Sequence, residues 1–389
     1  MNLPKPDPDA LAYSEALKRR IGDEIESAGG WIGFDRFMEL ALYAPGMGYY
    51  SGGAHKFGAA GDFVTAPEIS SAFSQTLAAQ AMQIMAFSAP QIIEVGAGSG
   101  RLAADMLLEL EVRAALPERY SILDLSGELR QRQQATIAQR APHLLDRVTW
   151  LDRLPERFDG LVLANELLDA MPVHLVVWGS EEDELAILER GVGWENNEFV
   201  CCDRPAQDHV LERAQALAFE NPLPPGYLSE ICLASSDWTA AWASILGLGA
   251  LLLIDYGFPR HEYYHAQRNT GTLMCHYRHH SHGEPFFLPG LQDITAHVDF
   301  TAIVESGFEA GLEFLGYTTQ AAFLLNCGLT DVLARIPAED SIRYLPQAQA
   351  AQKLISPAEM GELFKVIALG KGINETLIGF AQGDRSASL

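Results

Sequence analysis

The chain has 389 residues, of which 27 are Lys or Arg and 51 are Asp or Glu, so its formal net charge at pH 7 is −24. Hydrophobic residues make up 48% and charged residues 20%, which is a globular composition. This acidity excludes a general attraction to nucleic acid or to anionic lipid, because both need a basic face. It favours a cationic partner only weakly, since acidity also promotes solubility.

The longest apolar stretch, residues 245–254, is too short to span a membrane and indicates a buried strand. The N-terminal segment MNLPKPDPDA has neither the basic and apolar regions of a signal peptide nor the arginines of an organelle presequence. The five cysteines form no C-x-x-C pair, as expected of reduced thiols. We therefore expect a cytoplasmic protein without membrane insertion.

The first 85 residues predict helices at 11–28, 32–43 and 69–87, separated by an aromatic, glycine-rich loop. We interpret segment 1–85 as a helical lid. Segment 86–180 alternates strands with helices, which predicts parallel pairing in an α/β sheet. Its strands are expected at 91–95, 120–125, 148–151 and 160–165, and its helices at 101–110 and 129–139.

Segment 181–235 interrupts this alternation and is interpreted as a β-rich insertion, with a hairpin turning at residues 195–197. Segment 236–389 resumes the sheet. It predicts a helix at 237–246, a strand at 250–256, loops at 257–300, and further strands at 314–325 and 364–369.

The glycine-rich turn Glu94-Val95-Gly96-Ala97-Gly98-Ser99-Gly100 joins a predicted strand to a predicted helix. Glycines at such a turn let a ligand approach the backbone, and the helix N-terminus favours a polar or anionic group. A dinucleotide fingerprint is G-x-G-x-x-G, so the third glycine comes one residue early. The motif is similar to the first motif of Rossmann-like S-adenosylmethionine (SAM) methyltransferases; an ordinary βα turn is the alternative.

Asp124 follows at the end of the next predicted strand. An acidic side chain there can accept both ribose hydroxyls of a nucleoside, as in dinucleotide-binding folds. A solvated carboxylate is the alternative, but together with the glycines we favour ribose binding. We also assign Ala97, Leu125 and Leu151 to the cofactor site.

Asn165 and Glu166 lie at the carboxyl end of the fourth predicted strand, where open α/β sheets bind ligands. A carboxylate there can form a bidentate pair with a guanidinium group. We predict that Glu166 clamps an arginine substrate and that Asn165 contributes to both substrate and cofactor binding. Acidic residues also stabilise helix N-termini, and for Asp169 this structural explanation is preferred.

The segment GDFVTAPEIS predicts a capped helix start, with Thr65 at the N-cap, Pro67 near the first position and Glu68 at the third. The same geometry can point the helix at a ligand. We predict that Thr65 and Pro67 line the cofactor and that Glu68 is a second catalytic carboxylate.

Seven of the eleven histidines lie within residues 261–297, including a cluster at 276–282. No C-x-x-C or H-E-x-x-H motif accompanies them, and transfer from a sulfonium needs no metal. We therefore expect loop histidines and no metal. His297 and Asp299 are better candidates for shaping a substrate pocket.

From about residue 32 to residue 372 the chain resembles the MidA-like SAM-dependent methyltransferases. The resemblance is carried by FDRFMELALYAPGMGYY, GDFVTAPEIS, EVGAGSG, LANELLDAMPVH, LLIDYGF, GTLMCHY, PGLQDITAHVDF and MGELFKVIALGKGI. It implies a Rossmann-like, seven-stranded methyltransferase sheet, with SAM as donor and S-adenosylhomocysteine as product. The family includes a mitochondrial protein arginine methyltransferase that assists assembly of respiratory complex I.

This chain departs from the family pattern at Asp124, where Glu is expected, and at Met274 and Cys275 in the GTL segment. The resemblance implies methylation of an arginine on a protein substrate, such as a complex I subunit. Methylation of a small molecule and an assembly chaperone that only binds SAM are alternatives. A dinucleotide enzyme is a further alternative, against which the early third glycine argues.

Overall fold

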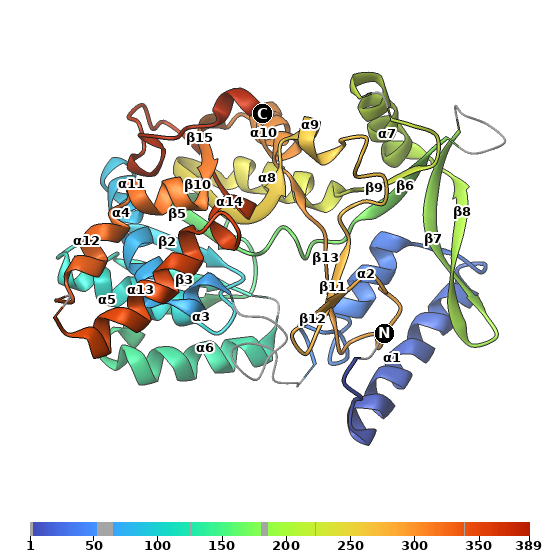
Figure 1. Cartoon of the computed structure of the whole chain (residues 1–389), viewed down its shortest axis with the longest axis horizontal. Helices are drawn as coiled ribbons and strands as arrows, with labels where there is room; N and C mark the ends of the chain where they lie inside the picture. Colours follow the sequence, from blue (N-terminus) through green and yellow to red (C-terminus); the bar gives the residue numbers. More distant parts are fainter. Residues whose placement is uncertain (1–2, 53–64, 125, 180–185, 222, 338) are drawn as a thin grey trace. The chain divides into compact units, whose positions relative to one another are not determined.

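The computed structural model describes residues 3–52, 65–124, 126–179, 186–221, 223–337 and 339–389 (Figure 1). The chain forms two compact units. Unit 1 comprises Met1–Phe63, Leu168–Asp237 and Phe258–Asp299, and unit 2 comprises Val64–Leu167, Trp238–Gly257 and Phe300–Leu389. Each unit is thus assembled from three separate stretches of sequence.

Unit 2 is built on a sheet in which seven strands follow the order β15-β16-β10-β5-β2-β3-β4. Strands β10, β5, β2, β3 and β4 are parallel, and β16 is antiparallel to both of its neighbours. The bounds are β2 Gln91–Val95, β3 Arg119–Leu123, β4 Val148–Leu151, β5 Phe158–Asn165, β10 Leu246–Phe258, β15 Glu313–Thr319 and β16 Phe364–Lys371.

Apolar runs such as Ala250–Ile254 are fully buried in this sheet, as expected for parallel strands with both faces covered. Helix α4 packs against α5 and β5, and α10 packs against β15 and β16. The helices of unit 2 are α3 Ala66–Ile69, α4 Ser71–Phe87, α5 Arg101–Val112, α6 Gly127–Arg140, α10 Phe300–Glu309, α11 Gln320–Asn326, α12 Leu329–Ala334, α13 Ser341–Ile355 and α14 Met360–Leu363, with 3-10 turns η1 Pro142–Arg147, η2 Ile378–Phe380 and η3 Ser386–Ser388. Helix α8, Leu233–Ile245, crosses the boundary between the units.

Unit 1 contains a sheet in which β7 pairs with β1, β6 and β8, and β6 also pairs with β9. It also contains a small sheet in the order β12-β11-β13. Both are antiparallel. The bounds are β1 Ile32–Gly33, β6 His174–Trp178, β7 Ile187–Glu195, β8 Glu198–Pro205, β9 Tyr227–Ile231, β11 Met274–Tyr277, β12 His280–His282 and β13 Asp293–Thr295. The two-residue strand β14, Val298–Asp299, belongs to neither of these sheets.

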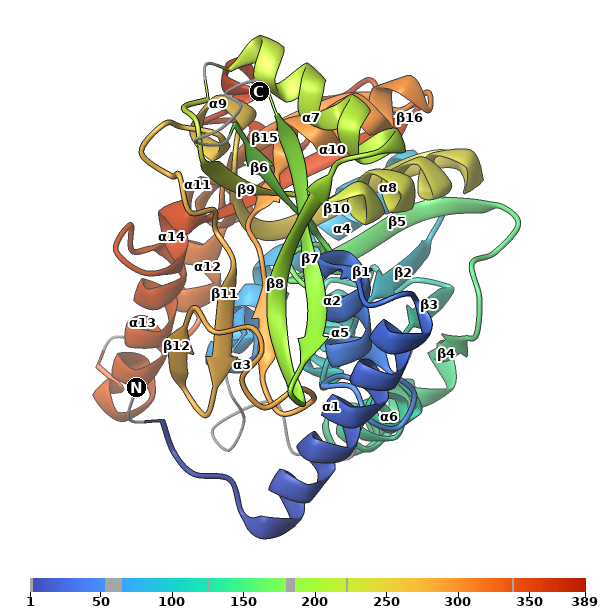
Figure 2. The same ribbon diagram turned by 90° about the vertical axis from the view of Figure 1, so that its right-hand side faces the viewer.

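Helices α1 (Pro8–Ser27) and α2 (Phe34–Tyr43) lie against β7 and bury a shared apolar core (Figure 2). That core includes Leu17, Ile21, Phe37 and Val192. Helix α7 (Asp208–Glu220) packs against β6, β7 and β9, and α9 (Arg260–Tyr263) is a single turn.

Most predicted elements of the α/β sheet are confirmed, including the strands at 91–95, 148–151 and 160–165. The hairpin is also confirmed, because Asn196 and Asn197 both have the positive φ that a two-residue turn requires. No helix in the described ranges is long and apolar enough to cross a membrane.

Two predictions are wrong. The strand predicted at 314–325 ends at Thr319, whose side chain accepts a hydrogen bond from Ala322 N and caps helix α11. The predicted loop 257–300 contains helix α9 and the sheet β12-β11-β13. These strands have only three or four residues, too few to produce a recognisable alternation.

Candidate functional site

The glycine turn leaves β2 and enters α5 with all three glycines in left-handed conformations, φ being +70° at Gly96, +51° at Gly98 and +81° at Gly100. Other residues rarely adopt such angles. A Cβ on Gly96 would lie 2.8 Å from Leu167 Cδ1, and one on Gly100 would lie 2.8 Å from Gln133 Cα. A Cβ on Gly98 would meet no described atom within 4 Å, so the turn is packed at both ends and open in the middle.

Glu94 lies in β2 before this turn and is almost completely buried. The Tyr120 hydroxyl in β3 donates a 2.6 Å hydrogen bond to Glu94 Oε2. Burial raises the pKa of Glu94 to about 7; the hydrogen bond from Tyr120 lowers it and the negative charge of Asp124 raises it further. At neutral pH the carboxyl group is therefore close to its midpoint of ionisation.

Asp124, at the end of β3, accepts hydrogen bonds from Ser126 N at 3.0 Å and from Gln133 Nε2 at 2.8 Å. Gln133 also donates to Gly98 O at 3.2 Å and accepts from Trp150 Nε1 at 3.0 Å. This buried amide joins the glycine turn to the predicted ribose-binding residue. No sequence pattern marks Gln133, because it lies within a polar helical stretch.

Asn165 and Glu166 stand at the carboxyl end of β5, which pairs with β2 through Val95 and Ala164. Glu166 has φ +52°, an uncommon value for a residue with a side chain. Its N–H donates to Ile254 O at 2.9 Å, and Leu167 N donates to Asp255 Oδ2 at 3.1 Å. The end of β10 therefore holds the backbone in this left-handed turn.

The Glu166 carboxylate accepts hydrogen bonds through Oε1, from Ala66 N at 3.3 Å and from Asn165 Nδ2 at 3.0 Å. Asn165 Oδ1 is buried and has no hydrogen-bond partner among the described residues. A buried acceptor without a partner is costly, so Asn165 Oδ1 is a candidate for binding a ligand donor.

Thr65, Pro67 and Glu68 form the start of helix α3, as predicted, although the Thr65 side chain makes no capping hydrogen bond. Glu68 accepts a hydrogen bond from Ser99 Oγ through Oε1, and its Oε2 lies 3.4 Å from Arg101 Nη1. Both partners belong to the turn and helix that follow β2. Residues 61–64 of the GDFVTAPEIS segment lie outside the described residues.

Leu151 ends β4, and its carbonyl oxygen accepts a 3.0 Å hydrogen bond from Arg130 Nη2. Ala97 is buried within the glycine turn. Leu125 falls outside the described residues, so its predicted role in cofactor binding stays a prediction.

His297 and Asp299 belong to unit 1. The His297 ring stacks on Phe258 with centroids 5.1 Å apart, and Asp299 Oδ2 lies 3.5 Å from Arg260 Nε. Within the histidine cluster, His276 lies in β11, while His280 and His282 lie in β12. These three histidines therefore lie in strands of a small sheet and not in the predicted loop.

A family model for S-adenosyl-L-methionine-dependent methyltransferases matches residues 75–318. The chain belongs to this family. Its methyl donor is therefore SAM, and its fold is the α/β methyltransferase fold. A methyltransferase homologue from Burkholderia thailandensis, solved with S-adenosylhomocysteine bound, is 54% identical, with a TM-score of 0.95 and full coverage of both chains. A second structure from that organism is 53% identical, with a TM-score of 0.92 and full coverage of both.

More distant relatives carry names that state an activity. The mitochondrial protein arginine methyltransferase NDUFAF7 homologue of Drosophila melanogaster is 28% identical over 96% of this chain and 90% of its own length. The zebrafish NDUFAF7 protein is 26% identical over 92% of this chain and 87% of its own.

The residues of unit 2 fit a SAM molecule. The open space at Gly98 lets a ligand reach the backbone, Asp124 lies at the end of the neighbouring strand, and Asn165 offers a buried acceptor. A cofactor with hydroxyl groups and a charged amino group has donors for these acceptors.

Proposed function

We propose that the protein transfers a methyl group from SAM to an arginine side chain of a protein substrate. The names of the mitochondrial relatives support this acceptor, and the similarity to them extends over nearly the whole chain. The net charge of −24 agrees with a cationic acceptor, because a negative surface raises the local concentration of positively charged partners.

The conformation of Glu166 is the observation that carries the proposal. A left-handed residue with a bulky side chain costs free energy of order 1–3 kcal/mol, and such strain concentrates at functional sites. Strand β5 ends beside the glycine turn, so this carboxylate belongs to the edge of the sheet where the donor is expected. A carboxylate can hold a guanidinium through two parallel hydrogen bonds.

In this proposal the bound SAM supplies a methyl group already activated by its positively charged sulfur. The glycine turn and Asp124 bind and orient the donor. Glu166 holds the guanidinium so that one nitrogen faces the methyl carbon, and Asn165 helps to fix the Glu166 carboxylate. Alignment of this kind can account for a large part of the rate. As the nitrogen takes up the methyl group, the donor leaves as S-adenosylhomocysteine, and the proton displaced from that nitrogen passes to Glu166 or to water.

The test combines labelled SAM with a lysate of the source cells and mass spectrometry of labelled proteins. We expect label on arginine, and a fall of about 100-fold in kcat/KM for Glu166→Gln on the identified substrate, because the amide loses one acceptor and its charge. Glu362→Gln is a matched control, since Glu362 forms an exposed pair with Arg385 in the same unit.

The outcomes separate the alternatives. Label confined to small molecules would show a different acceptor, and SAM binding without any transfer would show a binding protein. A respiratory complex I subunit is the first purified candidate to test. Fractionation of cells tests the associated proposal that enzyme and substrate meet in the cytoplasm.

A further inference from the structure

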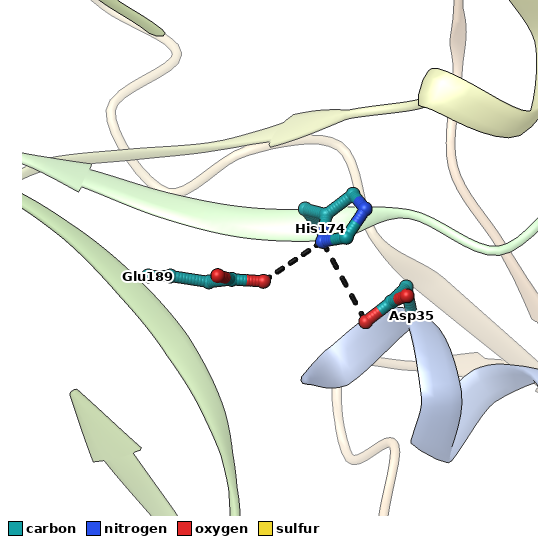
Figure 3. Close-up of side chains that lie close together, drawn as sticks. All are labelled: Asp35, His174 and Glu189. Carbon is teal, nitrogen blue, oxygen red and sulfur yellow. Dashed lines mark hydrogen bonds and ion pairs between the residues drawn. The ribbon is translucent and has the colours of Figure 1, made fainter. Parts of the chain in front are cut away.

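We propose that Asp35, His174 and Glu189 form a binding site for a divalent transition-metal ion, with Zn²⁺ as the reference ion. The three residues come from the first turn of α2, the first residue of β6 and the third residue of β7 (Figure 3). The proposal concerns unit 1 alone and does not depend on methyl transfer.

The distances suit a metal ion. His174 Nδ1 lies 2.8 Å from Glu189 Oε1 and 3.5 Å from Asp35 Oδ1, and the three candidate ligand atoms all lie within 4.8 Å of one another. A tetrahedral zinc ion with bonds of about 2.0–2.2 Å separates its ligand atoms by about 3.3–3.6 Å. Small side-chain adjustments would therefore bring all three atoms to bonding distance.

The charges also suit a divalent cation. Two carboxylates facing a neutral imidazole carry a charge of −2, and protonation of the imidazole leaves −1, whereas a divalent ion neutralises the group. The nearest arginines in sequence have other partners, because Arg36 pairs with Glu24 and Glu39 while Arg190 pairs with Asp203. Within the described part of the chain, neither Asp35 nor Glu189 pairs with a lysine or arginine.

The strand register and a glycine explain why the three side chains lie close together. Val176 is the register partner of Glu189, and His174 lies two residues before Val176, so His174 and Glu189 share one face of the sheet. The absence of a side chain at Gly33 leaves space for the two carboxylates. A Cβ at this position would collide with Asp35 Oδ1 and lie 3.3 Å from Glu189 Oε1.

The ligand types indicate the class of ion. An imidazole nitrogen favours zinc and its transition-metal neighbours, whereas carboxylates alone favour magnesium, calcium or manganese. The side chains are 34% exposed at Asp35, 17% at His174 and 13% at Glu189. A bound ion would therefore have protein ligands on one side and remain accessible to water on the other.

The experiment titrates ZnCl₂ into metal-free, full-length protein by calorimetry and repeats the titration on His174→Ala, Glu189→Gln and Asp35→Asn. We expect one equivalent of Zn²⁺ in the unmodified protein, with affinity reduced at least 10-fold in each variant. At the same Zn²⁺ concentration, the rise in Tm should be smaller in each variant than in the unmodified protein. Circular dichroism establishes that each variant is folded.

Two controls keep the assignment specific. His209→Ala removes an exposed histidine that pairs with Glu212 in the same unit, and the double substitution of His279 and His280 by Ala removes exposed histidines of the 276–282 cluster. Both should bind Zn²⁺ unchanged. If Asp35→Asn, the mildest and most exposed change, binds Zn²⁺ as tightly as the unmodified protein, or if that protein binds none, the proposal is wrong.

Discussion

The Tyr120 hydroxyl donates a 2.6 Å hydrogen bond to Glu94 Oε2, joining β3 to β2 directly before the glycine turn. Because Glu94 is buried, its pKa is raised to about 7, while the same group in the unfolded chain ionises near its ordinary value of about 4.3. Between these two pH values the folded protein holds a proton that the unfolded chain has lost. Stability from this group therefore falls as pH rises through that window.

For Glu94→Gln we expect this pH dependence to disappear. Relative to the variant, the free energy of unfolding of the unmodified protein should fall by up to about 3 kcal/mol between about pH 4 and pH 8. The reason is that a buried carboxylate must ionise over this range. Urea-induced unfolding across this range, without SAM, measures the difference. A difference that does not vary with pH would show that Glu94 titrates normally.

Glu109 should contribute a pH dependence of stability opposite in sign to that of Glu94, and Glu109→Gln tests it. Burial raises the pKa of Glu109, but hydrogen bonds from Arg335 and Arg113 outweigh that effect and hold it below its ordinary value. This carboxylate therefore stabilises the fold above its unfolded pKa and loses that effect as pH falls through its folded pKa. We expect Glu109→Gln to lower the free energy of unfolding by about 1–3 kcal/mol at neutral pH, as measured by the same unfolding experiment.

Gly98→Val should weaken SAM binding at least about 100-fold, equivalent to about 2.7 kcal/mol, because a branched side chain would fill the open space at the turn. Gly311→Val is the matched control. Gly311 also has a positive φ and no described atom within 4 Å of an added Cβ, but it lies between α10 and β15. Calorimetry with SAM and S-adenosylhomocysteine should show loss in the first variant only.

Glu68→Gln tests whether that carboxylate positions the turn or takes part in transfer. Because its contacts are with Ser99 and Arg101, we expect about a 10-fold weaker SAM affinity and nearly unchanged kcat at saturating SAM. The split between KM for SAM and kcat measures this. A large fall in kcat at saturation would instead support the catalytic role predicted from the sequence.

The sequence predicted the parts of the site that depend on local pattern. Gly96, Gly98 and Asp124 could be placed because strand ends and glycine turns follow from neighbouring residues. Gln133 could not be placed, since its contacts with Gly98, Asp124 and Trp150 arise only when α6 packs beside the turn. The same limit applies to Asp35, His174 and Glu189, which three distant elements bring together.

Strand β16 has a consequence for how the protein is made. It pairs with β10 from Gly249 to Tyr256 and with β15 from Glu313 to Thr319, so both strands are synthesised before their shared partner. Until the ribosome has released Phe364–Lys371, β10 lacks its β16 partner along one edge. A nascent or prematurely terminated chain would expose this edge to other copies, and aggregation of truncated product is the expected result.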